Sequence, residues 1–243
     1  MHGKNRLNRI SLPFFLGLSV LILSGGFMLG EEPDTSETDQ LKEFAPRLWQ
    51  AQKRIWTSPL KSKTWENPAS WIFAGAVAGS FTLDDGFSRD LRENDSFGDL
   101  NRVLASRQAE LVMWAIPVAT MAVGEIGNFD GTAEYGWKLT EGAVNAFLVS
   151  RLMKLAAGRS RPHNGDNYSF FSGGDSFPSG HSILAWTLAE TTVRHYPDRK
   201  WIPWVAYPLA GLVAFSRVSS GNHYASDAVT GSLIGFSIGH WAN

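Results

Sequence analysis

The fold is decided by the stretch GAVNAFLVSRLMKLAA, residues 142–157. Its apolar residues occupy nearly every side of an α-helix, so we expect this helix to be buried. Lys154 is unusual there, because a buried ammonium group is costly unless an anion lies beside it. Gly158 is a natural helix end, and Pro162 favours an extended backbone at Arg161, which lets that guanidinium turn back toward Lys154. The stretch therefore predicts a buried helix whose C-terminal end places cationic side chains at an anion-binding site.

Similar apolar stretches lie on both sides of this helix, separated by segments rich in Gly and Pro. They predict further helices at residues 71–83, 111–124, 183–193, 201–215 and 229–241. We found no internal repeat and no useful run with the two-residue period of a strand. The sequence therefore predicts an all-α fold, a helical bundle with about six core helices around an anion pocket.

The composition limits the classes of protein to consider. The chain has 243 residues, enough for one catalytic domain and a short appendage. Hydrophobic residues make up 44% and charged residues 19%, which excludes general disorder. The net charge of -1 gives no general attraction to nucleic acid, so any anion binding must be local. The absence of Cys excludes disulfides, thiol catalysis and thiolate metal sites.

The N-terminus has the pattern of an export signal, because basic residues at positions 4–9 precede the uncharged run 10–30. We expect residues 1–30 to be a signal peptide, with a weak cleavage site after Gly26, or an uncleaved membrane anchor across 12–29. A buried N-terminal helix of a cytosolic protein is the third alternative.

Residues 31–69 are expected to be a linker and an amphipathic helix, and residues 70–243 the catalytic domain. Residues 31–40 are acidic and polar, as in a linker, whereas apolar residues recur at helical spacing within 41–56. This helix is expected to pack on the domain, and a helix on a membrane surface is the alternative.

Hydropathy favours a soluble or membrane-associated bundle over a polytopic membrane protein. The mean hydropathy is -0.13. Beyond residue 30 the runs 67–83 and 201–216 are among the longest uncharged ones, and they fall short of the roughly 20 residues of a spanning helix. Some tryptophans are expected at a bilayer interface, with burial in the bundle as the alternative for most: Trp49, Trp56, Trp71, Trp114, Trp201 and Trp204.

A second cluster of polar residues is Pro178-Ser179-Gly180-His181, which opens an apolar helix. Ser179 is a natural N-cap, and the free amides of Gly180 and His181 make a helix N-terminus suited to phosphate. His181 shares a helical face with apolar residues, so it is expected to point inward. The preceding stretch 163–176 is a candidate mobile lip over a site.

A third cluster consists of Ser216-Arg217, His223 and Asp227. The spacing of four places the Asp227 carboxylate where it can accept the imidazole N–H and leave the other nitrogen free. A nucleophilic histidine needs this arrangement. Arg217 is a further cation at the end of an apolar segment.

Together the clusters resemble the signature of the type 2 phosphatidic acid phosphatase and vanadium haloperoxidase superfamily. That signature is Lys, six residues, Arg-Pro; then Pro-Ser-Gly-His; then Ser-Arg, five residues, His, three residues, Asp. The sequence matches it without a departure from Lys154 to Asp227. The resemblance implies that the following residues bind the phosphoryl group: Lys154, Arg161, Ser179, Gly180 and Arg217.

The resemblance also implies a mechanism. His223 would attack phosphorus to form a phosphohistidine, and Asp227 would orient it. His181 would protonate the leaving alcohol and later activate water. The implied enzyme is a metal-independent phosphatase that needs no cofactor and acts on phosphomonoesters or terminal pyrophosphates.

We expect the substrate to be a phosphorylated lipid or a small phosphoester, and the protein to lie in the cell envelope, periplasmic or anchored by its N-terminus. A membrane surface is a possible partner, nucleic acid is not, and the sequence does not indicate the oligomeric state. The alternatives are a soluble periplasmic acid phosphatase, a vanadate-dependent haloperoxidase, and a phosphate-binding module without catalysis. The short chain argues against the haloperoxidase, and the presence of both histidines argues against the binding module.

The remaining polar residues receive no chemical role. His163 is expected to be a loop residue, and His195 and His240 to lie at helix ends. Asp84 and Asp85 are expected in an exposed turn rather than in a metal site.

Overall fold

The computed structural model describes residues 35–162 and 169–241, and every regular element in these residues is a helix. The predicted all-α fold is confirmed. The six expected core helices are α4 (Pro68–Ser80), α7 (Arg107–Gly127), α8 (Asp130–Ala157), α9 (Gly180–His195), α10 (Ile202–Ser219) and α11 (Ala225–Trp241). The other helices are α2 (Thr35–Thr57), α3 (Ser62–Trp65), α5 (Gly86–Glu93), α6 (Gly98–Leu104) and 3-10 turns at Ser58–Leu60, Phe81–Leu83 and Asp95–Phe97. The expected signal or anchor, residues 1–30, and His163 lie outside the described residues.

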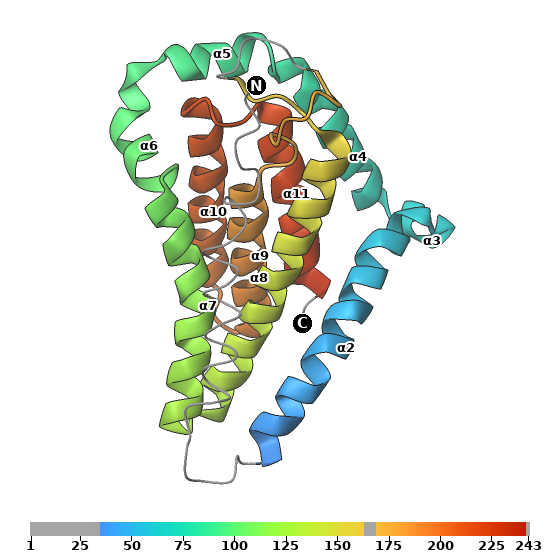
Figure 1. Ribbon diagram of the computed structural model, residues 1–243, viewed down its shortest axis with the longest axis vertical. Coiled ribbons are helices and arrows are strands. Elements are labelled where there is room, and N and C mark those ends of the chain that lie inside the picture. Colours follow the sequence, from blue (N-terminus) through green and yellow to red (C-terminus); the bar gives the residue numbers. More distant parts are fainter. Residues whose placement is uncertain (1–34, 163–168, 242–243) are drawn as a thin grey trace, which may run out of the picture.

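Helix α9 is the centre of the bundle, because it packs against α8, α10 and α11 (Figure 1). Helix α7 pairs with α8, α2 lies along the outside of α8, and α5 and α6 contact α10. This order puts the last turns of α8 and α10 at the same end of the bundle as the first turns of α9 and α11. The N-termini of α9 and α11 carry partial positive charge, which favours an anion beside them. The last turns of α8 and α10 carry Lys154 and Arg217, whose charges outweigh the partial negative charge of those helix ends.

Close packing of α9 against α11 depends on glycines spaced four residues apart on α11. A Cβ on Gly235 would lie 2.2 Å from the carbonyl oxygen of Ile183, and a Cβ on Gly231 would lie 2.7 Å from that of Ser179. Any larger residue would push the helices apart. The apolar core beside this contact includes Leu139, Val149, Ile183, Leu184 and Leu188.

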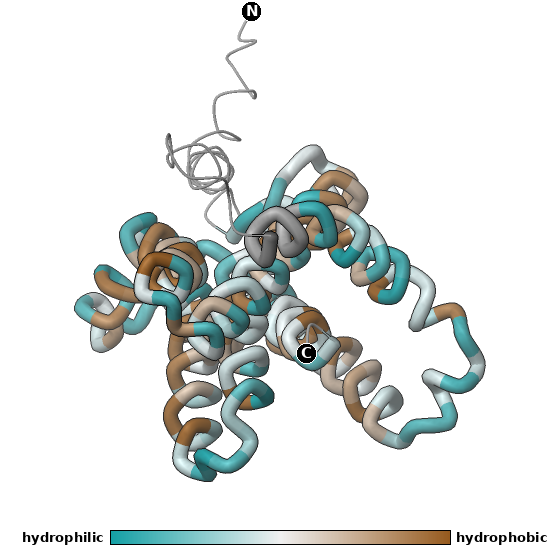
Figure 2. Tube along the Cα trace, turned by 90° about the horizontal axis from the view of Figure 1, so that it is seen from below, coloured by the Kyte–Doolittle hydropathy of each residue, from teal (hydrophilic) through white to brown (hydrophobic). Residues whose placement is uncertain are grey.

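The outer surface carries many exposed apolar side chains, and Figure 2 shows hydrophobic residues recurring along the helices. Among the described residues, α7 is the helix that is long and apolar enough to cross a membrane. Its side chains Val112, Ile116, Val123 and Ile126 are all exposed. Burial in the bundle was the alternative for most of the six tryptophans named above, but five of them are exposed: Trp49, Trp56, Trp71, Trp201 and Trp204.

Two local expectations differ from the structure. Helix α2 begins at Thr35, inside the expected linker 31–40; acidic residues, which are frequent there, favour the first turns of a helix. Asp84 and Asp85 were expected together in an exposed turn. Asp85 is exposed, but Asp84 is 5% exposed because it is ion-paired with Arg159.

Candidate active site

The predicted site residues converge on a cavity of about 550 Å³ at the end of the bundle where α9 begins. Residues Lys154, Arg161, Gly180, His181, Arg217 and His223 line it. Ser179 and Asp227 do not line the cavity; both are fully buried behind its wall. Residues from α7 and α8 complete the lining, among them Glu110, Trp114 and Phe147.

Lys154 reaches the cavity from the last turn of α8, which ends at Gly158 in the left-handed conformation with φ of 54°. Its ammonium donates a hydrogen bond to the carbonyl oxygen of Asp175. Burial and the positive charge of Arg161 lower the pKa of Lys154 to about 8. An anion in the cavity would reverse that shift, so the lysine is suited to hold one.

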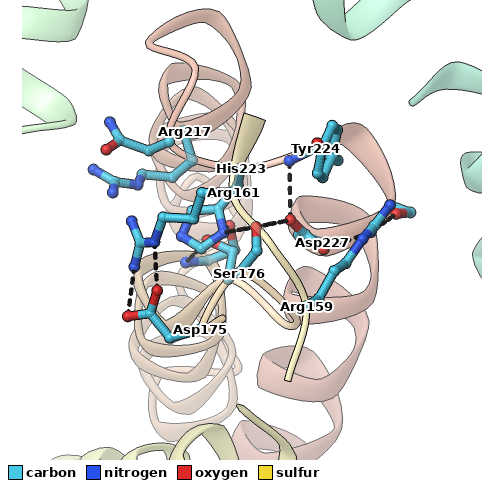
Figure 3. Close-up of polar contacts among 12 residues, drawn as sticks. Arg159, Arg161, Asp175, Ser176, Arg217, His223, Tyr224 and Asp227 are labelled. Atoms are coloured by element: carbon cyan, nitrogen blue, oxygen red, sulfur yellow. Dashed lines mark hydrogen bonds and ion pairs between the residues drawn. The ribbon is translucent and has the colours of Figure 1, made fainter. Parts of the chain in front are cut away.

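Arg161 is held by Asp175, a residue that the sequence analysis did not identify. Its Nε lies 2.7 Å from Asp175 Oδ1 and its Nη2 lies 3.1 Å from Oδ2 (Figure 3). Burial alone would raise the pKa of Asp175, but the hydrogen bonds and charge of Arg161 lower it to about 2. The carboxylate therefore stays ionised and fixes the guanidinium at the edge of the cavity.

Arg217 supplies the third cation from the last turn of α10, and it is 4% exposed. One of its terminal nitrogens donates to the carbonyl oxygen of Ala105. Burial and repulsion from Arg161 lower the pKa of Arg217 to about 10. It remains charged at neutral pH.

Ser179 caps α9, as the sequence predicts. Its hydroxyl accepts the N–H of Ser182 at 3.4 Å and the Ser182 hydroxyl at 3.0 Å. Its own N–H donates to the carbonyl oxygen of Asp227 at 3.0 Å, which ties the start of α9 to α11. Gly180 follows and lines the cavity, where a Cβ would lie 3.0 Å from Ser150 Oγ.

His181 lies in the first turn of α9 and is 12% exposed. Burial and the charges of Arg217, Lys154 and Arg161 lower its pKa to about 3. Its Nε2 is buried without a hydrogen-bond partner and lies 3.7 Å from Glu110 Oε2 on α7. Glu110 is a further residue that the sequence analysis missed.

His223 lies in the turn between α10 and α11, where its backbone N–H donates to the carbonyl oxygen of Arg217 at 3.0 Å. The side chain is 2% exposed. Burial holds the pKa of His223 well below its usual value, and the charges of Lys154, Arg161 and Arg217 lower it further. The imidazole is therefore neutral at neutral pH and keeps a lone pair for attack.

Asp227 lies behind His223 in the first turn of α11, at 3.5 Å between Oδ2 and His223 Nδ1. The same oxygen accepts the Ser176 hydroxyl at 2.5 Å and the Tyr224 N–H at 2.9 Å (Figure 3). The other oxygen accepts Arg159 Nη1 at 2.7 Å. The expected spacing therefore does bring His223 and Asp227 together.

The residues that sequence reasoning missed are Asp84, Glu110, Arg159, Asp175 and Ser176. Arg159 lies between Lys154 and Arg161 in the chain, so the density of cations there was an available signal. No sequence pattern pointed to Asp84, Glu110 or Asp175, because isolated carboxylates are common on helical proteins. Among the described residues, no group of three or more His, Asp and Glu side chains is placed to hold a metal ion.

The region of the chain that contains this site is similar to known proteins. A sequence profile described as the PAP2 superfamily matches residues 135–243. The chain is 30% identical to a lipid A 1-phosphatase of Porphyromonas gingivalis over 126 residues, which is 50% of this chain and 27% of that protein. It is 29% identical to an undecaprenyl-diphosphatase of Sulfolobus acidocaldarius over 137 residues, which is 55% of this chain and 63% of that protein.

The matched regions span less than two thirds of either relative's length. Among solved structures, a transmembrane PAP2 type phosphatidylglycerolphosphate phosphatase from Bacillus subtilis aligns with 95% of this chain and 93% of its own, at 19% identity and a TM-score of 0.44. The profile match contains every residue of the predicted site, from Lys154 to Asp227. Residues 135–243 of this chain are therefore similar to the PAP2 superfamily.

Proposed function

We propose that this chain is a phosphatase that hydrolyses phosphomonoesters or terminal pyrophosphates through a phosphohistidine intermediate. The observation that carries the proposal is the convergence of Lys154, Arg161 and Arg217 with a neutral His223 on one cavity. The relatives named above as phosphatases support it.

Phosphate binding would fall to the three cations and the N-terminus of α9. A unit charge about 4 Å from a phosphoryl oxygen contributes roughly 4 kcal/mol of attraction at an effective dielectric constant near 20, before desolvation is subtracted. The Gly180 amide adds a hydrogen bond of the kind that helix N-termini offer to phosphate. Ser179 would act mainly through the cap, because its hydroxyl is fully buried. Three fixed cations would neutralise the charge that metal ions neutralise in other phosphatases.

In the first chemical step, Nε2 of His223 attacks phosphorus and the bond from phosphorus to the leaving oxygen breaks. His181 gives its proton to that oxygen. Asp227 accepts the Nδ1–H of His223 and stabilises the positive ring that forms; the 3.5 Å separation is expected to shorten when substrate binds.

In the second step, water attacks the phosphohistidine. His181 now takes a proton from the water, the bond from phosphorus to nitrogen breaks, and phosphate leaves. His181 must be protonated for the first step although its pKa is low in the free protein. A bound phosphoryl dianion would offset the cations that depress this pKa, so substrate binding would prepare the acid.

Lipid phosphates are our preferred substrates. Trp114, Phe147 and Leu184 give the cavity an apolar wall beside its cations. The exposed apolar side chains of α7 and the exposed tryptophans would contact a bilayer. We place the protein in the cell envelope, with residues 1–30 as a signal or anchor and residues 70–243 as the catalytic domain.

The decisive assay is phosphate release from a panel that contains phosphatidic acid, phosphatidylglycerophosphate, undecaprenyl pyrophosphate, a lipid A analogue and an aryl phosphate. Activity should survive EDTA and be inhibited by orthovanadate, which adopts the five-coordinate geometry of phosphoryl transfer. Loss of turnover on chelation and its recovery with Mg²⁺ would contradict the three-cation account. Bromide oxidation by the vanadate-loaded protein without phosphatase activity would favour the haloperoxidase.

Membrane association is tested by fractionation and by a truncated protein that starts at Glu31. We expect the truncated protein to act on lipid phosphates in mixed micelles. A fully soluble truncated protein that hydrolyses aryl phosphates and leaves lipid phosphates untouched would instead indicate a soluble acid phosphatase.

A further inference from the structure

We propose that Arg159 and Asp84 are positioning residues that act on His223 through Asp227. The inference rests on the proposed function, because it assigns His223 as the group that these residues prepare. Neither residue lines the cavity, so neither touches the substrate.

Arg159 joins two carboxylates from distant parts of the chain. Its Nη1 lies 2.7 Å from Asp227 Oδ1, and its Nη2 lies 2.6 Å from Asp84 Oδ2. Ser226 closes the group, because its hydroxyl lies 2.6 Å from both Arg159 Nη1 and Asp84 Oδ2, and its N–H donates to Asp84 Oδ1 at 2.8 Å. The result is a continuous chain of contacts from Asp84 through Arg159 and Asp227 to His223. Figure 3 shows Arg159, Asp227 and His223 of this chain.

The group is shielded from water. Arg159 is 1% exposed, Asp84 5% and Asp227 0%. The guanidinium carbon lies 4.4 Å from the centre of the Tyr224 ring and 4.8 Å from that of Phe170, so aromatic faces hold it as well. Taking three charges out of water is expensive, and replacing such a group with apolar residues is often neutral or stabilising. Fold stability alone therefore does not account for it.

The geometry indicates that Arg159 fixes the orientation of the Asp227 carboxylate. Arg159 occupies Oδ1, which leaves Oδ2 turned toward Ser176, the Tyr224 N–H and His223. A carboxylate fixed on one side cannot rotate away from the imidazole. His223 would then keep one tautomer, with the proton on Nδ1.

Asp84 supplies the charge balance. With Arg159 alone, Asp227 would form a neutral pair and would stabilise a positive imidazole less well. The second carboxylate brings the group to a net charge of -1. That negative charge faces a histidine surrounded by Lys154, Arg161, Arg217 and His181.

Asp84 lies where the Phe81–Leu83 turn leads into α5, outside residues 135–243. The segment that precedes the matched region therefore contributes to the chemistry, through a contact with the first turn of α11. A protein cut down to the matched region would lack this carboxylate.

The test compares Asp84→Asn with Asp85→Asn, a matched control that removes the same charge from the exposed neighbouring residue. We expect Asp84→Asn to lower kcat by about 10- to 100-fold, as loss of an outer partner typically does. The inhibition constant of inorganic phosphate should stay within about twofold of wild type, because the three cations are untouched. Asp85→Asn should match wild type in both. A normal kcat in folded Asp84→Asn protein, or a loss confined to phosphate binding, would overturn the proposal.

A second variant covers the case in which Asp84→Asn does not fold. Arg159→Lys keeps the positive charge but replaces two separate nitrogens, Nη1 on Asp227 and Nη2 on Asp84, with a single ammonium. It should therefore lower kcat while phosphate inhibition persists. Unchanged kcat in that variant would also contradict the proposal.

The histidine ¹⁵N spectrum tests the inference without turnover. The Nδ1–H tautomer of His223 should lose population in Asp84→Asn and not in Asp85→Asn; an unchanged spectrum counts against the positioning role. Wild-type protein inactive on every phosphate ester would remove the proposed function, and this spectrum would still decide the inference.

Discussion

Glu110 Oε2 on α7 lies 3.7 Å from Nε2 of His181 at the start of α9, and it is the carboxylate paired with that ring. The pKa of His181 is lowered to about 3 by burial and by Arg217, Lys154 and Arg161. A negative charge beside Nε2 favours the protonated ring and so opposes those cations. The position of Glu110 therefore suits a role in making His181 an acid.

Glu110→Gln should move the alkaline limb of the kcat profile to lower pH. Removing the negative charge lowers the pKa of His181 in the substrate complex, so His181 loses its proton at a lower pH. The effect should be larger for alkyl phosphates than for aryl phosphates, whose leaving groups need little protonation.

The matched control is Glu134→Gln, because Glu134 lies on the outside of α8 and pairs with Lys138. It should leave the profile unchanged. An alkaline limb that does not move in Glu110→Gln would show that this carboxylate does not govern the acid.

Gly235→Ala should destabilise the protein by about 1–3 kcal/mol, the usual cost of overpacking a core. Its Cβ would lie 2.2 Å from the carbonyl oxygen of Ile183 and would force α11 away from α9. Gly211→Ala is the control, because nothing lies within 4 Å of a Cβ there. Alanine at position 211, inside α10, should stabilise the folded protein by about 0.5–1 kcal/mol. Equal effects of the two substitutions in chemical denaturation would contradict the packing account.

Stability in the absence of phosphate should fall as pH falls. The pKa of His181 is about 3 in the folded protein and 6.5 in the unfolded chain, so the unfolded chain binds the extra proton below pH 6.5. The stability contribution is present above the unfolded value and is lost as pH falls toward the folded value. From pH 7 to pH 5 the loss from His181 is about 2 kcal/mol. Denaturation of His181→Asn protein should show a pH dependence smaller by about this amount, and an equal dependence would be inconsistent with a buried neutral ring.

The sequence predicted the helices because their apolar stretches are long and separated by glycine and proline. The resemblance of their clusters to a known signature implied that Lys154, His181 and His223 share one pocket, and all three side chains line one cavity. Helix α2 was placed less well, since its first turns are polar and resemble a linker.

The partners of these residues were beyond sequence reasoning. Asp84 and Arg159 are 75 residues apart in the chain and meet only because the fold packs the Phe81–Leu83 turn against α11, where the segment after α8 also lies. Asp84 looked like its neighbour Asp85, and no local pattern says which of two adjacent carboxylates turns inward. Glu110 likewise occupies an ordinary helical position, and it lies beside His181 only because α7 packs against α9.

The most direct test of the account is to trap the phosphoenzyme. Labelled substrate is mixed with the protein, the reaction is stopped at alkaline pH, where phosphohistidine survives, and the modified peptide is located by mass spectrometry. We expect label on His223, and neither label nor turnover in His223→Ala. Label on another residue, or undiminished label in His223→Ala, would contradict it.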